Sequence, residues 1–296
     1  MNGARRAFAC LVFVLIPWAG VQAQERSPYV PDGYELELSD EMNGRDLNKL
    51  LWSTHFMTWN VRHLEGNRDL GFKVADDEVF GRKRRTVRQY LRAATGLPGP
   101  FMHDVSNGTL KMRTYRLPKR LRKVFDGFPY LASMISMEHS HAQRYGYWEV
   151  KLRLNRFGKG HHLAFWMLPS NGSWPPEVDM LEVIGGDNNL YTNLHMPEGV
   201  NVPPFSYIDG KGTINDWMTI GFEWTPEIMR WTVNGKVMRE HAAPAIDQPM
   251  YFLASWEVGS NWPGSPDRTT PWPCEVEIDH VRIYGQKSIQ QAGLAP

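Results

Sequence analysis

The sequence has 296 residues, and its 33 Lys and Arg residues nearly match its 32 Asp and Glu residues, giving a formal net charge of +1. This balance argues against a dedicated nucleic-acid binder, which usually carries a clear basic excess. All-β sandwiches commonly reach about 200–250 residues as one domain, so the length favours a single domain with a sizeable core.

The N-terminus has the pattern of an export signal. Arg5 and Arg6 precede an apolar run over residues 7–19, and small residues follow at 21–23. This order predicts a signal peptide over residues 1–23 that is removed, so we expect a product secreted to the periplasm or the medium. The apolar run is too short to span a bilayer, and we expect no membrane insertion.

Beyond a lead-in over residues 24–33, the chain shows short runs of alternating polar and apolar residues. Many such runs separated by turn residues predict an all-β sandwich or barrel, here over residues 34–286 with a tail at 287–296. Asn234-Gly235 separates two of the runs and predicts a hairpin turn. The expected strands are 34–38, 109–115, 147–154, 162–168, 178–184, 217–224, 229–233, 250–254 and 276–284.

Two segments and one cysteine stand apart from this pattern. Residues 82–92 and 119–123 are strongly basic. They are expected either as solvated loops or as a cleft rim that attracts an anionic polysaccharide. Once the signal peptide and its Cys10 are removed, Cys274 has no cysteine partner, so the fold must hold without an intramolecular disulfide.

Three carboxylates lie within six residues, at Glu177, Asp179 and Glu182. Alternate side chains share one face of a strand, so the first two acids point the same way. Glu182 is an odd number of residues from Glu177 and would face the other side of a regular strand. A β-bulge near Met180–Leu181 would return it to the face of the other two acids.

Crowding of this kind has a chemical consequence. Like charges at close range cannot all ionise easily, so at least one pKa rises. A protonated carboxyl beside an ionised one is the pair that cleaves glycosidic bonds. The same spacing is also compatible with a solvent-facing acidic strand or a cation site, although the flanking Trp and Pro residues are unlike a solvated charge run.

At this point the sequence resembles glycoside hydrolase family 16, the group of laminarinases, lichenases, agarases and carrageenases, in its bulged Glu-x-Asp-x-x-Glu branch. The resemblance implies a concanavalin A-like β-jelly-roll sandwich with a concave substrate cleft. It runs over roughly residues 105–285, with a weaker match from about residue 34. Its motifs, in order, are 144–152, 164–169, 174–182, 192–195, 221–226, 231–235, 258–264 and 277–284.

The resemblance also implies roles. Glu177 would be the nucleophile, Glu182 the general acid/base and Asp179 an assisting carboxylate, in endo-cleavage that retains anomeric configuration. A β-1,3 or β-1,3/1,4-glucan is the leading substrate. A transglycosylase, a hydrolase of an acidic or galactan polymer, and a non-catalytic carbohydrate-binding protein are kept as alternatives. Residues 255–261 depart from the family's usual run.

Further candidates follow from residue chemistry and from the resemblance. Tryptophan offers a large apolar face with a polar edge, which suits stacking on sugars. A polysaccharide is the expected partner of a monomer, without cofactor or catalytic metal, although Asp279 matches a family position that contributes to a structural calcium site. The predicted substrate-binding residues are Trp166, Trp174, His195, Trp256 and Trp262.

Overall fold

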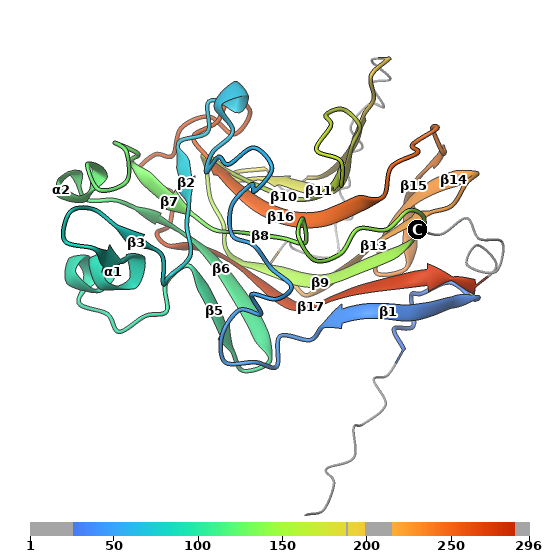
Figure 1. Ribbon diagram of the computed structural model, residues 1–296, viewed down its shortest axis with the longest axis horizontal. Helices are drawn as coiled ribbons and strands as arrows, with labels where there is room; N and C mark the ends of the chain where they lie inside the picture. The colour runs from blue at the N-terminus through green and yellow to red at the C-terminus, as the bar shows by residue number, and fades with distance from the viewer. Residues whose placement is uncertain (1–25, 188, 199–214, 288–296) are drawn as a thin grey trace, which may run out of the picture.

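The fold is a sandwich of two sheets, seen in a computed structural model that describes residues 26–187, 189–198 and 215–287 (Figure 1). The predicted signal peptide lies outside the described residues. The all-β prediction is confirmed, and each of the nine expected strands forms. The five-stranded sheet has the order β12 (Leu190–His195), β11 (Glu177–Ile184), β10 (His161–Pro169), β16 (Met250–Val258), β8 (Met134–Ser136).

The second sheet lies below the first in the view of Figure 1. Within the described residues it has ten strands, with β1 (Tyr34–Asp40) paired to β17 and β5 (His103–Ser106) paired to β6 at its side. Its main path is β15 (Lys236–Ala242), β14 (Ile228–Val233), β13 (Met218–Trp224), β9 (Gly146–Arg156), β17 (Cys274–Gln286), β6 (Thr109–Arg116), β7 (Tyr130–Ala132), β2 (Gly71–Lys73).

The main core fills the space between the two sheets. Trp148, Trp224 and Trp231 are fully buried there, and Trp148 stacks on Trp224 with ring centroids 6.3 Å apart. The indole N–H of Trp231 donates to the backbone carbonyl of Asp179 at 2.9 Å, which ties the acidic strand to the core. Trp217, just before β13, is half-buried beneath the Arg153 guanidinium and lies outside this core.

The basic segments form more structure than the expected loops. Residues 82–92 contain β4 (Arg85–Thr86), which pairs with β3 (Val79–Phe80), and most of helix α1 (Val87–Thr95). Thr86 begins α1 with a capping box, because its hydroxyl accepts from the Gln89 N–H while the Gln89 side chain accepts from the Thr86 N–H. Residues 119–122 form α2 (Lys119–Arg122).

These elements build a second, smaller core at one end of the sandwich (Figure 1). Val87, Tyr90 and Leu91 of α1 pack there with Phe125 and with Phe72 of β2. Their three-and-four spacing gives the helix one apolar face and leaves its arginines in solvent. We call residues 79–100 and 114–130 the basic lobe.

Two smaller predictions concern local structure. The Asn234-Gly235 hairpin is confirmed, since Val233 pairs with Lys236 and both turn residues have positive φ. Cys274 is a buried thiol without a disulfide. None of the described helices has the length and apolar character needed to cross a membrane.

Candidate active site

A bulge in β11 brings the three predicted acids to one face of the five-stranded sheet. Asp179 pairs with Trp166 of β10 and Leu181 pairs with Phe165, so Met180 is the additional residue. The register on the β12 side shifts between Asp179 and Glu182 as well. The bulge predicted near Met180–Leu181 is therefore confirmed, and Glu182 shares its face with the other two acids.

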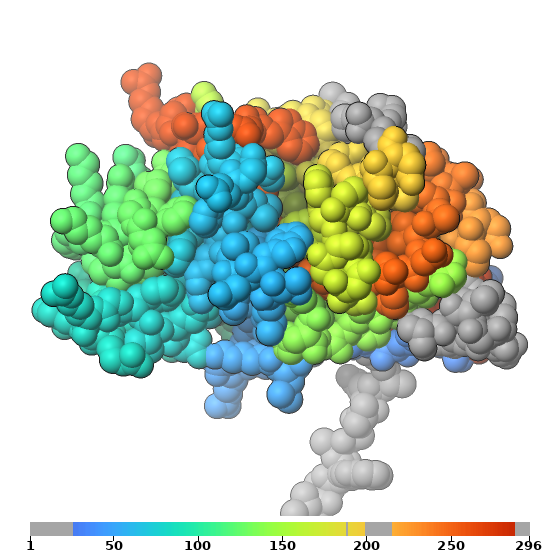
Figure 2. All heavy atoms as spheres, turned by 45° about the horizontal axis from the view of Figure 1, so that its top comes forward, coloured from blue at the N-terminus to red at the C-terminus, as the bar shows by residue number. Residues whose placement is uncertain are grey.

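The acids lie on the floor of a valley. The loop of residues 170–176 and the segment with η1 (Glu65–Asn67) both rise above the five-stranded sheet, and the space-filling view is hollowed between them (Figures 1 and 2). Side-chain exposure is 16% for Glu177, 3% for Asp179 and 12% for Glu182. The valley is thus deep enough to limit water while leaving both glutamates open to a substrate.

His195 of β12 lies between the first two acids. Its Nε2 is 3.4 Å from Glu177 Oε1 and 3.4 Å from Asp179 Oδ2. The contact with Asp179 raises the pKa of His195 to about 9, so the imidazole is cationic at neutral pH. One atom each from Glu177, Asp179 and His195 lies within 4.8 Å of the others. A metal ion there would compete with the imidazolium, so these residues suit an ion pair better than a metal centre.

Glu177 and Glu182 are both held above their ordinary pKa. Burial is the main cause for each, and the charge of Asp179 between them adds to it. His195 and a 2.7 Å hydrogen bond from the Trp174 indole oppose the shift at Glu177. Because the carboxyls interact, the proton that they retain belongs to the pair. The site can therefore supply one protonated and one ionised carboxyl.

Two of the predicted tryptophans are exposed, one at each end of the acid row. Trp174, 58% exposed, lies beside Glu177 and His195. Trp262, 48% exposed, packs edge-on against His162 and Tyr191 near Glu182. Exposed indoles at both ends are suitably placed to stack on sugar rings.

The prediction for Trp256 is wrong. Trp256 is fully buried and packs against Phe157 and His161 in the main core. On β16 its neighbours Ser255 and Glu257 face the valley, and side chains alternate along a strand, so Trp256 must face the core.

Trp166 does lie on the valley face, but only 5% of it is exposed. Phe56 packs edge-on against its ring, and its indole donates to Ser255 Oγ at 3.1 Å. Trp166 therefore supports the valley floor, and it does not present a stacking face there, contrary to the prediction.

Sequence reasoning missed His162 and Glu257 as residues of the site. His162 Nε2 lies 2.9 Å from Glu182 Oε1, and its Nδ1 lies 3.7 Å from Glu257 Oε2. Asn67 donates to the other oxygen of Glu257 at 2.9 Å. The signal available in the sequence was alternation, because His162, Ala164 and Trp166 occupy one face of β10.

The surroundings of Asp279 do not suit a structural calcium ion. One carboxylate oxygen is 3.2 Å from Lys151 Nζ and the other is 2.8 Å from His280 Nδ1. Calcium requires six to eight oxygen ligands, whereas this carboxylate already faces two nitrogen groups.

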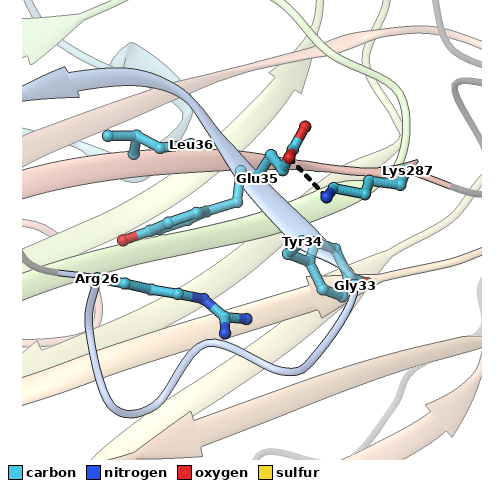
Figure 3. A pocket seen from close by; sticks show the side chains of 7 residues that line it. Arg26, Gly33, Tyr34, Glu35, Leu36 and Lys287 are labelled. Atoms are coloured by element: carbon cyan, nitrogen blue, oxygen red, sulfur yellow. Dashed lines mark ion pairs between the residues drawn. The ribbon is translucent and has the colours of Figure 1, made fainter.

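A surface pocket lies where the lead-in meets β1, away from the acids (Figure 3). Lys287 Nζ and Glu35 Oε1 lie 2.6 Å apart there, beside Arg26 and Tyr34. Since β1 belongs to the ten-stranded sheet, this pocket is separate from the candidate active site.

Comparison with known proteins agrees with this geometry. Residues 101–282 match the model of glycosyl hydrolases family 16. The match covers more than half of the chain, which therefore belongs to this family. Endo-1,3-1,4-beta-glycanases ExsH and EglC of Rhizobium meliloti are 29% and 27% identical over 192 residues. Each alignment covers 64% of this chain, which spans about two fifths (40%) of each relative.

Solved structures show the same fold. The endo-beta-1,3-glucanase of Pyrococcus furiosus aligns with a TM-score of 0.69 at 24% identity, covering 88% of this chain and 98% of that one. The laminarinase catalytic domain of Thermotoga petrophila aligns with a TM-score of 0.68 at 22% identity, covering 86% and 98%. The jelly-roll fold class is thus confirmed.

Proposed function

We propose that this protein is an endo-acting glycoside hydrolase that cleaves a β-linked polysaccharide with retention of configuration. The observation that carries this proposal is the bulge at Met180, which turns Glu177, Asp179 and Glu182 to one partly dehydrated face. A solvated acidic strand would not bury these carboxylates beside two histidines. A binding protein would have no use for carboxyls whose pKa is raised by burial and by a neighbouring carboxylate.

The proposed reaction has two steps. Glu177 attacks the anomeric carbon and forms a glycosyl-enzyme bond, while the Glu182 carboxyl gives its proton to the departing glycosidic oxygen. Glu182, now ionised, takes a proton from water, and the resulting hydroxide displaces Glu177. Asp179 adds negative charge between the two glutamates, and His195 bridges it to Glu177. If a sugar hydroxyl replaces the water, the same intermediate gives transglycosylation.

We propose a β-1,3 or mixed β-1,3/1,4-glucan as the substrate. The printed activities of the Rhizobium meliloti relatives and the exposed Trp174 and Trp262 support this choice. Stacking on indoles suits the apolar faces of β-linked glucose units. Export of the protein also belongs to the proposal, and it rests on the Arg5-Arg6 pair and the apolar run that follows.

A second candidate substrate is an anionic polysaccharide, which the basic lobe favours. The lobe holds 11 Lys and Arg residues and one acid. Among the residues that the structure describes, none of these cations forms an ion pair with a carboxylate. Phe72 on β2 anchors the lobe, and Leu70 just before β2 bonds to Val258 of β16, so the lobe adjoins the Glu257 side of the valley. Such a charge concentration would attract a polyanion, and salt would weaken the attraction.

The experiment is a panel of neutral and anionic β-glycans assayed for new reducing ends, with Glu177→Gln as the inactive control. We expect cleavage of a glucan by the wild-type protein and none by the variant. If no polymer is cut, or if the variant cuts equally well, the proposed function is wrong.

The same panel separates the two substrate classes. The second candidate would be favoured if an anionic polymer is cleaved and the rate of cleavage falls with added salt and in the double variant Arg85→Gln, Arg88→Gln. The matched control replaces Arg45 and Arg268, exposed arginines outside the lobe, by Gln.

A further inference from the structure

His162 lies between two carboxylates on the valley floor. It is the cross-strand neighbour of Glu257 on β16, and it reaches Glu182 on β11 from the other side. Its Nε2 is 2.9 Å from Glu182 Oε1 and its Nδ1 is 3.7 Å from Glu257 Oε2. His162 is 8% exposed, Glu182 9% and Glu257 5%, so water screens their charges little.

The charges around His162 favour its protonated form. Burial alone would lower its pKa, but the contacts with Glu182 and Glu257 outweigh burial and raise it to about 10. The pKa of Glu257 falls to about 2 in spite of burial, because His162, Lys73 and Asn67 stabilise its carboxylate. An imidazolium with N–H groups on both sides can then face both acids.

The remaining charged groups near Glu182 come from several elements. Asp179 and Glu177 share its strand, and His195 faces it from β12. Lys73 of β2 is fully buried and pairs with Asp69, and Lys73 also stabilises the Glu257 carboxylate. Tyr191 is opposite Glu182 in register but donates its hydroxyl to Asp187. Among the described residues, His162 is therefore the cation in direct contact with Glu182.

Simple stabilisation is a poor explanation for this pair. Replacing buried ion pairs with well-packed apolar residues is often neutral or stabilising, so the stability of the fold alone does not require a buried carboxylate–imidazolium–carboxylate row here. The contact that explains the pair is the one with Glu182, whose Oε1 lies 2.9 Å from His162 Nε2.

We propose that His162 and Glu257 are positioning residues for the general acid/base Glu182. The His162 Nε2–H occupies Glu182 Oε1, which leaves Oε2 as the oxygen that exchanges a proton with the substrate. Glu257 lies behind the imidazolium, 3.7 Å from its Nδ1, and orients it, while the contact with Glu182 itself keeps it charged. This inference rests on the proposed function, because it gives Glu182 its acid/base role.

The two positioning residues have opposite effects on Glu182, and that difference gives the test. His162→Gln keeps a hydrogen-bond donor but removes the positive charge, so the pKa of Glu182 rises. Glu257→Gln removes a negative charge and leaves the imidazolium facing Glu182 alone, so the pKa of Glu182 falls. Both changes act through charge in a nearly dry site, and shifts of about one pH unit are expected for each.

The measurement is the pH profile of kcat/KM on the best polymer of the substrate panel. We expect the basic limb to move to higher pH in His162→Gln and to lower pH in Glu257→Gln. His280→Gln is the matched control, since His280 also lies between two carboxylates, Glu149 and Asp279, but on the ten-stranded sheet. Its basic limb should match that of the wild type.

Basic limbs that stay in place, or that move in the same direction in both variants, would overturn the inference. Melting temperatures establish that each variant is folded, and the isosteric Glu257→Gln alone tests the sign if His162→Gln does not fold. Glu182→Gln separates the two proposals. If it cuts like the wild type, the proposed function fails. If it is inactive while the limbs stay in place, only the positioning role fails.

Discussion

The carboxyls at the two ends of the acid row, Glu177 and Glu182, have their negative charges balanced by different kinds of neighbour. At Glu177 the neighbours are open to solvent, because His195 keeps 37% of its side chain exposed and Trp174 is an exposed indole. At Glu182 the compensating imidazole is buried, with Glu257 behind it and Trp262 across its edge. Two glutamates of one strand thus receive different environments from the strands on either side.

This difference fits a division of labour. A nucleophile needs access to the anomeric carbon, and the open neighbours of Glu177 allow it. An acid/base must keep a matched pKa through two proton transfers, and a fixed imidazolium gives Glu182 a constant charge environment. The bulge makes the division possible, because it brings Glu182 to the valley beside β10 rather than to the core.

The largest expected effect is the loss of either glutamate. Glu177→Gln and Glu182→Gln should each lower kcat on a polymer by at least about 10²–10⁴-fold. An aryl glycoside with a good leaving group distinguishes them, because its departure needs no proton. We expect a burst of phenol from Glu182→Gln and none from Glu177→Gln, and a burst from the latter alone would reverse the two roles.

Because Trp256 is buried and Trp262 is exposed, we expect the loss of the first to affect stability and the loss of the second to affect substrate binding. Trp256→Ala should lower the free energy of unfolding by about 3–5 kcal/mol, as expected for a buried indole. Trp262→Ala should leave stability unchanged and raise KM about 2- to 10-fold, since one aromatic contact contributes about 0.5–1.5 kcal/mol. Chemical denaturation and initial rates measure the two quantities. A Trp256→Ala protein with normal stability and a raised KM would restore the original stacking prediction.

Alkaline pH should lower the stability of the folded protein by removing the positive charge of His162, which lies beside Glu182. The pKa of His162 is raised from 6.5 to about 10, so its contribution to stability is complete below pH 6.5 and is lost as pH rises through about 10. We expect the melting temperature to fall over this interval, and less steeply in His162→Gln. His139→Gln, at an exposed histidine, serves as the control. Equal slopes in all three proteins would show that His162 is not charged in the folded state.

Metal removal should have the smallest effect. Because Lys151 and His280 already face the Asp279 carboxylate, EDTA should change neither the melting temperature nor the activity. A drop in melting temperature on chelation, restored by calcium, would contradict this view of the ten-stranded sheet.

Much of the site could be predicted because local rules determine it. The odd spacing of Glu177 and Glu182 required a bulge, and the structure has it at Met180. Alternation on β10 and β11 could be read without knowing which strands pair. His162 and Glu257 lie about 95 residues apart, and only the pairing of β10 with β16 brings them together. That pairing is not encoded in either segment alone.

Two errors have different physical causes. Trp256 was placed by residue type, although the alternation with Ser255 and Glu257 assigned it to the core face. Helix α1 was missed because the basic residues of the stretch 82–92 suggested a loop. The Thr86-x-x-Gln89 capping box and the apolar spacing of Val87, Tyr90 and Leu91 were readable helix signals.

The central claim is that Glu177 and Glu182 act as a nucleophile and an acid/base in double displacement. The most direct test is proton NMR of the first product released from a β-linked polymer, before mutarotation occurs. Two inversions at the anomeric carbon predict that the new reducing end appears as the β-anomer. An initial α-anomer would contradict the account, because it requires a single displacement by water and leaves Glu177 without a nucleophilic role.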